Sequence, residues 1–324
     1  MSKYLLGIDG GGTKTHACLT DLQGHIVATA TNGGANWERI GVPAAQTALL
    51  QVINEVLGKV QGEHSDLAGA TFALAGMDWS SDPEIFSAFS SSIGISKVST
   101  YINDAVAALY AGIPNGVGIA SIAGTGGKTV GFDGTTLVRT MGMSLGEGGG
   151  AGQLVGLAVE RMATSEHGQT PPTRLSKAIP ESYGITDIRT FFKAIAREDL
   201  TLTEDRAPII FELALFGDLG AIGVVQAVAK QHARDVFGIA NQLSFADSAI
   251  LVVRAGGLHC AESAVFNHSF ESTLHTLLPQ AQSKVLSIAP VIGATIHAAS
   301  KIYKEIPDEY LQNIHFDSTR LKEF

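Results

Sequence analysis

Close to its start the chain carries the stretch Gly7-Ile8-Asp9-Gly10-Gly11-Gly12-Thr13-Lys14-Thr15, in which three adjacent glycines separate two apolar segments. Residues 3–8 before the glycines and residues 15–20 after them have the pattern of β-strands. Glycine allows positive φ and lets an anion approach the backbone without a Cβ in the way. This stretch therefore predicts a tight turn that can cradle a phosphate, although an ordinary hairpin turn has the same composition.

The same pattern occurs a second time further along the chain. Residues 117–122 form an apolar segment, and the glycine turn Ala123-Gly124-Thr125-Gly126-Gly127 follows them. Lys14-Thr15 and Lys128-Thr129 hold equivalent positions directly after the two turns. We interpret this repetition as a duplication of one strand-turn-strand unit.

Two duplicated loops predict a site for a polyphosphate. If the two halves pack as equivalent domains, both loops face one cleft and hold the phosphates from two sides. Asp9 is then placed to hold a hydrated Mg²⁺, and the hydroxyls of Thr13 and Thr125 add hydrogen bonds. Lys14 would neutralise phosphate charge. A turn-capping role for Asp9 and a solvated strand position for Lys14 remain open.

The rest of the chain alternates between strand and helix patterns. Residues 43–60 place apolar side chains at helical spacing. Further strands are expected at residues 25–31, 70–75, 97–102, 135–140, 249–255 and 284–289. Further helices are expected at residues 82–91, 104–111, 150–164, 188–198, 205–216, 219–243 and 292–303, with another from Ala261. This alternation predicts an α/β fold with a mixed sheet covered on both faces.

The length and composition fit a globular protein of about two domains. The chain has 324 residues, of which 45% are apolar and 16% charged. We place the domain boundary near Pro114-Asn115-Gly116, which gives domains 1–115 and 116–324. The tail over residues 306–324 is polar and mixed, and either order or disorder fits it.

Charge and cysteine content exclude several classes of protein. The formal net charge is −9 and no run of five Lys or Arg occurs, so we expect no nucleic-acid partner. Cys18 and Cys260 are the only cysteines and argue against a disulfide framework or a cysteine-based metal site. The first apolar run is too short for a signal peptide, and no stretch of ~18 apolar residues occurs. We therefore expect a cytoplasmic protein without a membrane partner.

Three other motifs are matched only in part. Residues 124–129 end like a P-loop but lack its first glycine and lead into a strand pattern rather than a helix. Residues 146–151 fit the dinucleotide pattern, but a poor strand precedes them and Glu147 would repel a pyrophosphate. Residues 142–146 fit a nucleophile elbow, but further glycines stand where its helix should begin. A hydrolase is accordingly disfavoured.

Five segments in order along the chain resemble the actin-like sugar kinases. They are residues 7–15, 103–108, 123–126, 251–257 and 289–294. Within that superfamily the chain is similar to the BadF/BadG/BcrA/BcrD ATPase family, which includes the eukaryotic-type N-acetylglucosamine kinases. The resemblance implies a duplicated ribonuclease-H-like fold of two domains around an interdomain cleft, with ATP in the cleft and a sugar beside it.

The resemblance also implies roles for individual residues. Asp104 corresponds to the general base that takes the proton from the sugar hydroxyl, and a helix N-cap is the alternative. Asn36 corresponds to a sugar-contacting residue, with a turn residue as its alternative, and Trp37 beside it fits a core anchor equally well. The residues expected to bind the nucleotide are Gly10, Gly11, Gly12, Thr13, Lys14, Gly124, Thr125, Gly126, Gly256, Gly257 and Ala261. Those expected to bind the sugar are Asn36, Asp104, Gly127, Gly142 and Glu147.

The chain departs from the family pattern at one sugar-binding run. The kinases have Gly-Asp-Glu-Gly where this chain has Gly146-Glu147-Gly148-Gly149, so Glu147 would replace a shorter acid. A second branch of the family activates CoA-ester reductases and dehydratases through a cysteine-bound cluster, an arrangement that Cys18 and Cys260 do not match.

These observations together predict an ATP-dependent sugar kinase. We expect ATP and Mg²⁺ as cofactors and an amino sugar as substrate, N-acetylglucosamine or glucosamine, phosphorylated at the 6-hydroxyl. An ATPase that activates a partner enzyme and a non-catalytic sugar or nucleotide sensor are the alternatives. Asp104 disfavours the sensor, and the resemblance also allows a homodimer.

Overall fold

The computed structural model describes residues 3–143, 145–245 and 249–320. The chain divides into two compact units, Met1–Gly118 with Leu286–Phe324, and Ile119–Val285. We call them unit 1 and unit 2. The division differs from the expected domains in one respect, because the last part of the chain packs with the first unit. The assignment of functions to domains 1–115 and 116–324 stays a prediction.

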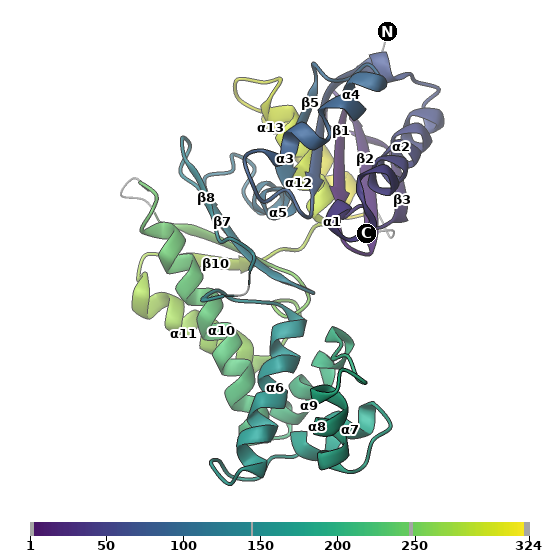
Figure 1. Ribbon diagram of the computed structural model, residues 1–324. Helices are drawn as coiled ribbons and strands as arrows, with labels where there is room; N and C mark the ends of the chain where they lie inside the picture. The colour runs from purple at the N-terminus through teal and green to yellow at the C-terminus, as the bar shows by residue number, and fades with distance from the viewer. Residues whose placement is uncertain (1–2, 144, 246–248, 321–324) are drawn as a thin grey trace. The chain divides into compact units, whose positions relative to one another are not determined.

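The sheet of unit 1 has five strands in the order β3-β2-β1-β4-β5 (Figure 1). The strands are β1 (Tyr4–Gly10), β2 (Lys14–Asp21), β3 (Ile26–Gly33), β4 (Leu67–Leu74) and β5 (Ser99–Asn103). The first three form an antiparallel meander, whereas β4 and β5 run parallel to β1. The carboxyl ends of β1, β4 and β5 therefore meet at one edge, where open α/β sheets place their ligands.

The sheet of unit 2 repeats this order. Its strands are β6 (Gly118–Ala123), β7 (Gly127–Phe132), β8 (Leu137–Arg139), β9 (Leu251–Ala255) and β10 (Gln282–Val285). From one edge to the other they are arranged β8-β7-β6-β9-β10, with β9 parallel to β6 and β10 parallel to β9. Strand for strand this matches unit 1, which confirms the duplication and the α/β fold expected from the sequence.

The helices of unit 1 pack on both sides of its sheet. They are α1 (Trp37–Ile40), α2 (Val42–Lys59), α3 (Asp82–Ile85), α4 (Ser87–Ser92), α5 (Asp104–Gly112), α12 (Pro290–Ser300) and α13 (Asp308–Ser318), with a short 3-10 turn at His64–Asp66. Helix α2 buries the apolar face that its spacing predicts, including Leu49, Ile53 and Val56. Helix α12 packs on α5 so closely that a Cβ on Gly293 would clash with the α5 backbone.

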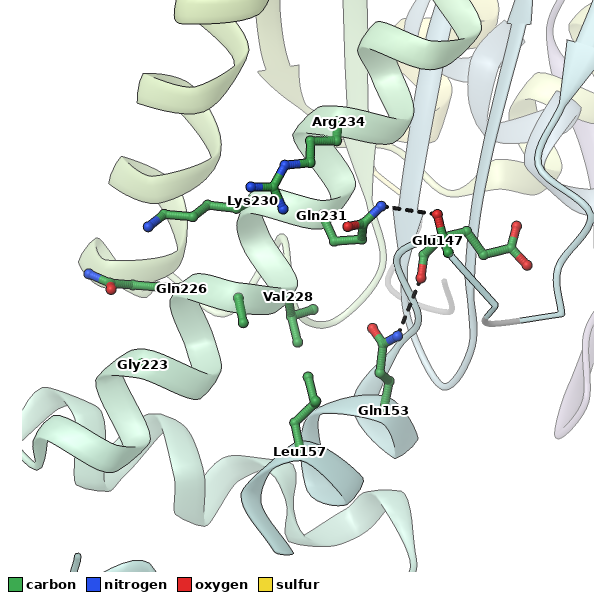
Figure 2. Close-up of a pocket in the computed structure, with 11 residues that line it drawn as sticks. Glu147, Gln153, Leu157, Gly223, Gln226, Val228, Lys230, Gln231 and Arg234 are labelled. Atoms are coloured by element: carbon green, nitrogen blue, oxygen red, sulfur yellow. Dashed lines mark hydrogen bonds between the residues drawn. The ribbon is translucent and has the colours of Figure 1, made fainter. Parts of the chain in front are cut away.

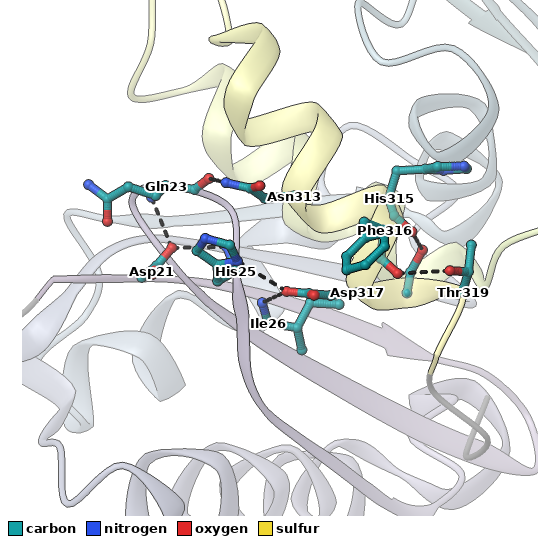
Figure 3. A network of polar contacts seen from close by, with 10 residues as sticks. Asp21, Gln23, His25, Ile26, Asn313, His315, Phe316, Asp317 and Thr319 are labelled. Atoms are coloured by element: carbon teal, nitrogen blue, oxygen red, sulfur yellow. Dashed lines mark hydrogen bonds and ion pairs between the residues drawn. The ribbon is translucent and has the colours of Figure 1, made fainter.

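Within the tail that the sequence left open, Asp308–Ser318 form the helix α13 in unit 1. Tyr310 of α13 is buried, and its hydroxyl lies 2.9 Å from Thr20 Oγ1 in β2. Figure 3 shows the polar contacts that continue this attachment at the β2–β3 turn: Asp317 Oδ2 accepts from the Ile26 amide at 3.0 Å, and Asn313 Nδ2 donates to Gln23 O at 2.9 Å. The start and the end of the chain are thus joined in one unit.

Unit 2 has a core of helices beside its sheet. They are α6 (Ala151–Glu166), α7 (Leu175–Ser182), α8 (Ile188–Ala196), α9 (Ala207–Leu215), α10 (Leu219–Ala240) and α11 (Ala264–Leu277), with a 3-10 turn at Glu204–Arg206. Helix α10 lies in the centre and contacts α6, α9 and α11. No single helix in the described ranges is long and apolar enough to cross a bilayer. Within the same ranges, only the bent pair Glu204–Leu215 and Leu219–Ala240 meets the criterion when both are combined.

Candidate nucleotide and sugar sites

Two carboxylates lie near each other at the strand edge of unit 1. Asp9 is the penultimate residue of β1, and Asp104 is the first residue of α5, directly after β5. Burial, and to a lesser extent the charge of Asp104, raise the pKa of Asp9 from its usual value to about 7. Such a pair has a strong tendency to attract a proton or a cation.

A buried amide fixes the backbone beside Asp104. Asn103 is 3% exposed, and its Oδ1 accepts from the Ala105 amide at 3.0 Å, so Asn103 is the N-cap of α5. Its Nδ2 donates to Asp78 Oδ1 at 2.8 Å. The N-cap alternative considered for Asp104 thus belongs to its neighbour. Asp78 and Asn103 were not among the expected site residues, although Asn103 ends β5 and Asp78 lies four residues after β4 at the same edge.

The first glycine loop connects β1 to β2 as expected. The amide of Gly11 donates to Lys14 O at 2.9 Å, while Gly12, Thr13 and Lys14 are exposed. We expected positive φ at the glycines of this loop, but none of them has it. Gly124, Gly126 and Gly127 of the second loop do not have it either. Close approach explains Gly10 instead, because its Cβ would lie 2.6 Å from Leu74 Cδ2.

Asn36 lies against the first loop. Its amide and that of Ala35 both donate to Gly11 O, at 3.2 and 3.0 Å. The Asn36 side chain is the N-cap of α1 and accepts from the Glu38 amide at 3.0 Å. Asn36 therefore has the alternative role considered for it, that of a turn residue. In this role it lies beside the first glycine loop.

The second glycine loop packs against the segment 146–151 in unit 2. The amide of Ala151 donates to Gly124 O at 2.8 Å. A Cβ on Gly127 would clash with Gly148 O, and one on Gly150 would clash with the carbonyl oxygens of residues 124–126. The second glycine loop was expected to bind phosphate, and the segment with Glu147 was expected to bind the sugar. These two backbone segments are therefore neighbours.

Glu147 is held within this segment. It is 7% exposed, and its Oε2 accepts from the amide of Gly142, another expected sugar residue, at 3.1 Å. Figure 2 shows Gln153 and Gln231 reaching the backbone of the segment from one side while the Glu147 carboxylate points away from them. The two amides donate to Glu147 O at 3.3 Å and to Gly146 O at 3.1 Å.

A pocket of about 620 Å³ joins four of the residues expected to bind the nucleotide. Gly124 and Thr125 line one part of it, and Gly257 and Ala261 another. The sequence analysis missed the apolar side chains in the lining, chiefly Pro208 and Phe211 of α9, and the acidic residues Glu204 and Asp205 beside them. A glycine loop beside an apolar wall is the arrangement that a nucleotide requires, because its phosphates need backbone donors and its base needs an apolar surface. Gly256 has φ +90° and lies close to the backbone of Ala123 and Gly124.

Asp9 is the residue that fits a Mg²⁺ ion. Within the described ranges no cluster of three His, Cys, Asp or Glu side chains forms a metal site. Mg²⁺ commonly binds through one or two carboxylates, several waters and substrate phosphates, so it does not require such a cluster. The raised pKa of Asp9 shows a carboxylate whose negative charge lacks compensation in the protein alone. The two cysteines are free: Cys18 is buried in β2, and Cys260 is exposed.

The fold and these loops define a duplicated α/β protein of the ATPase type. A family model described as the BadF/BadG/BcrA/BcrD ATPase family matches residues 6–298. The chain belongs to this family.

Two curated relatives and one solved structure are similar to this chain. The chain is 25% identical over 318 residues to an N-acetylmuramic acid/N-acetylglucosamine kinase of Clostridium acetobutylicum, covering 92% of this chain and 99% of that protein. It is 26% identical over 240 residues to an N-acetyl-D-glucosamine kinase of Dictyostelium discoideum, covering 67% and 73%. A ROK family glucokinase from Streptomyces griseus, solved with glucose and AMPPNP, shares the fold with a TM-score of 0.57 at 18% identity, covering 92% and 98%.

Proposed function

We propose that the protein is an ATP-dependent kinase that phosphorylates the 6-hydroxyl of an amino sugar, with N-acetylglucosamine as the first substrate to test and glucosamine as the second. Two curated relatives that are named as N-acetylglucosamine kinases, together with the match to an ATPase family, support the proposal. The observation that carries it is the position of Asp104 at the amino end of α5, next to Asp9 and braced by Asn103.

Asp104 acts as the general base. Its carboxylate accepts the proton of the sugar hydroxyl while that oxygen forms a bond to the γ-phosphorus of ATP. The bond between the γ-phosphorus and the bridging oxygen breaks, and ADP leaves with the electron pair. Asn103 fixes the helix start through its hydrogen bonds to Ala105 and Asp78, so the carboxylate has a defined position before substrate binds.

The nucleotide is bound by backbone donors and an apolar wall. The amides of Gly12, Thr13, Thr125 and Gly126 are the phosphate donors, since those of Gly11 and Gly124 donate to Lys14 O and Gly126 O within the loops. The pocket between Gly257, Phe211 and Pro208 receives the adenosine. Asp9 holds the Mg²⁺ ion, which neutralises phosphate charge when bound. Lys14 adds a positive charge at the first loop.

The proposed sugar contacts are those that the family resemblance implies. They are Asn36, Asp104, Gly127, Gly142 and Glu147. A carboxylate accepts hydrogen bonds from two neighbouring hydroxyls, and each bond to a charged acceptor contributes ~1.5–3 kcal/mol. Glu147 is the residue most suited to select the sugar.

A coupled assay of ADP release tests this function across a panel of hexoses and amino sugars. A kinase consumes ATP only when its sugar is present, and mass spectrometry then finds one phosphate on that sugar. ATP hydrolysis at the same rate without any sugar would favour the partner-activating ATPase instead. Binding of sugar or ATP without turnover would favour the sensor.

A further inference from the structure

A chain of buried hydrogen bonds connects the strand before the second glycine loop to the segment that carries Glu147. Ser121 in β6, His232 in α10 and His259 are 0%, 0% and 1% exposed. Ser121 Oγ lies 3.2 Å from His232 Nδ1 and 3.2 Å from His259 Nε2. His232 Nε2 in turn lies 2.9 Å from the carbonyl oxygen of Gly149.

The direction of each hydrogen bond follows from its partners. A carbonyl oxygen only accepts, so His232 Nε2 carries the proton and donates to Gly149 O. Burial lowers the pKa of His232 to about 4, so the ring is neutral and its Nδ1 accepts from the Ser121 hydroxyl. Ser121 then accepts from His259 Nε2. The chain runs His259 to Ser121 to His232 to Gly149 and has one arrangement only.

The next turn of α10 holds the adjacent residue of the same segment. Asp235 Oδ2 accepts from the amide of Gly148 at 2.6 Å, and its Oδ1 accepts from Gln231 Nε2 at 3.0 Å. A Cβ on Gly148 would lie 2.9 Å from the His232 ring, so glycine is needed for this approach. Two side chains of helix α10 therefore bind the backbone directly after Glu147. Asp235 accepts from the Gly148 amide, and His232 donates to the Gly149 carbonyl oxygen.

We propose that His232 is a positioning residue that fixes the Glu147 segment relative to β6 and the second glycine loop, and so sets the affinity for the sugar. This inference rests on the proposed function. His232 touches neither expected ligand, and it acts through Gly149 and Ser121. Residues 146–150 form no helix or strand, so the contacts with α10 and with residues 124–127 determine their conformation.

The test compares His232→Phe with His232→Gln. Phenylalanine keeps the ring volume and removes both hydrogen bonds, whereas glutamine retains an amide donor for Gly149 O. We expect His232→Phe to raise the KM for the sugar by at least about tenfold while the Kd for ATP changes less than about threefold. We expect His232→Gln to restore most of the sugar affinity.

His297→Phe is the matched control. His297 is a buried histidine of unit 1, with its Nδ1 3.0 Å from Thr71 Oγ1, so its loss has a similar effect on packing without touching the segment. An unchanged sugar KM in folded His232→Phe would overturn the proposal. A sugar KM that rises equally in His297→Phe would also overturn it, because the effect would then be general destabilisation.

Hydrogen exchange separates this inference from the proposed function. The amide of Gly148 is bonded to Asp235 and buried, so a peptide covering residues 145–151 should exchange slowly in the native protein. We expect His232→Phe to accelerate that exchange at least about tenfold, with peptides from β9 unchanged. Unchanged exchange refutes the positioning role. If the native protein phosphorylates no sugar, the proposed function fails while the exchange result still decides the positioning role.

Discussion

The two glycine loops follow equivalent strands of the same topology, and in each unit the segment after the third strand braces the loop. In unit 1 the amides of Ala35 and Asn36 donate to Gly11 O. In unit 2 the amide of Ala151 donates to Gly124 O, and the backbone at Gly148 and Gly150 packs directly on the loop. Each bracing segment also carries one proposed sugar contact, Asn36 or Glu147.

The difference lies in what holds the bracing segment. Both segments lead at once into a helix, but in unit 1 the side chain of Asn36 itself caps α1, whereas the N-cap of α6 is Gly150, which has no side chain to do so. In unit 2 the segment is held from outside by side chains of α10 and by Gln153. A duplicated fold has thus kept the pairing of a phosphate loop with a substrate segment, while the means of fixing that segment differ.

The largest expected effect separates catalysis in unit 1 from binding in unit 2. Asp104→Asn should lower kcat by at least ~10²-fold and leave the Kd for ATP within about threefold, since general-base assistance contributes ~10²–10⁴-fold. Steady-state kinetics and calorimetry with ATP measure the two quantities. Asp308→Asn, at the exposed start of α13, is the control. Full turnover in folded Asp104→Asn would show that Asp104 is not the general base.

Substitutions of neighbouring glycines distinguish ligand approach from loop bracing. A Cβ on Gly126 would meet no protein atom within 4 Å, so Gly126→Val should keep the melting temperature and weaken ATP binding at least about tenfold. Gly127→Val should cost ~1–3 kcal/mol of stability, because its side chain meets Gly148 O. Gly11→Val should weaken ATP binding as Gly126→Val does.

The measurements are thermal unfolding and ATP titration of the three variants. If Gly11→Val and Gly126→Val differ, with only one affecting ATP, a single loop binds the nucleotide and the two loops have different functions. A stable Gly127→Val would show that the second loop does not depend on its bracing segment.

The third test concerns the sugar contact of unit 2. Glu147→Gln should raise the KM for the sugar at least about tenfold, which corresponds to ~1.4 kcal/mol, and move the KM for ATP little. Glu147→Asp should give a partial loss because the shorter side chain does not reach the same hydroxyls. An effect on ATP alone would place Glu147 on the metal side of the site.

The smallest expected effect is a difference in acid sensitivity between the units. Burial lowers the pKa of His232 to about 4, of His259 well below its ordinary value, and of His297 to about 3. Below about pH 6.5 the unfolded chain binds protons that these folded groups do not, so stability present above pH 6.5 is lost as the pH falls. Two of these histidines, His232 and His259, belong to unit 2. Unit 1 has His297 and also His16, whose pKa burial lowers, but the raised pKa of Asp9 acts in the opposite direction there, because the folded carboxyl keeps a proton that the unfolded one releases.

Tryptophan fluorescence reports unit 1 alone, because Trp37 and Trp79 are the only tryptophans. We expect circular dichroism and fluorescence to give the same urea midpoint at about pH 7.5. At about pH 5.5 the dichroism should begin to change at lower urea, because unit 2 loses up to ~1 kcal/mol more than unit 1. Coincident curves at both pH values would show that the units unfold together.

Much of the fold could be predicted because strand and helix patterns are local. The opening hairpin, its repeat and the long helix α10 all lie within a few residues of their expected bounds. Helices α7 and α13 were missed because their apolar faces are short and can be recognised only from the residues that they pack against. In α13, for example, the Tyr310 hydroxyl contacts Thr20 of β2. The return of α12 and α13 to unit 1 depends on contacts that no local pattern contains.

The binding roles of the candidate site residues stay predictions, but some of the residues that the family resemblance grouped together are in contact. Glu147 and Gly142 were both expected, and the structure joins them by a hydrogen bond. His232 and Asp235 give no such signal, because a histidine and an aspartate within an otherwise ordinary helix match no motif. The positive φ expected of the loop glycines was wrong, since close approach of Gly127 and Gly150 to neighbouring backbone gives a sufficient reason for glycine.

The return of the chain to unit 1 has a consequence for synthesis on the ribosome. Unit 2 is one continuous stretch, Ile119–Val285, and every strand of its sheet emerges from the ribosome before the last helices of unit 1 do. Unit 1 still lacks α12, which covers β1 and β4, and exposes that apolar surface in the meantime. Transiently exposed apolar surface promotes aggregation, so the nascent N-terminal half is most prone to it until the closing stretch Leu286–Phe324 has emerged.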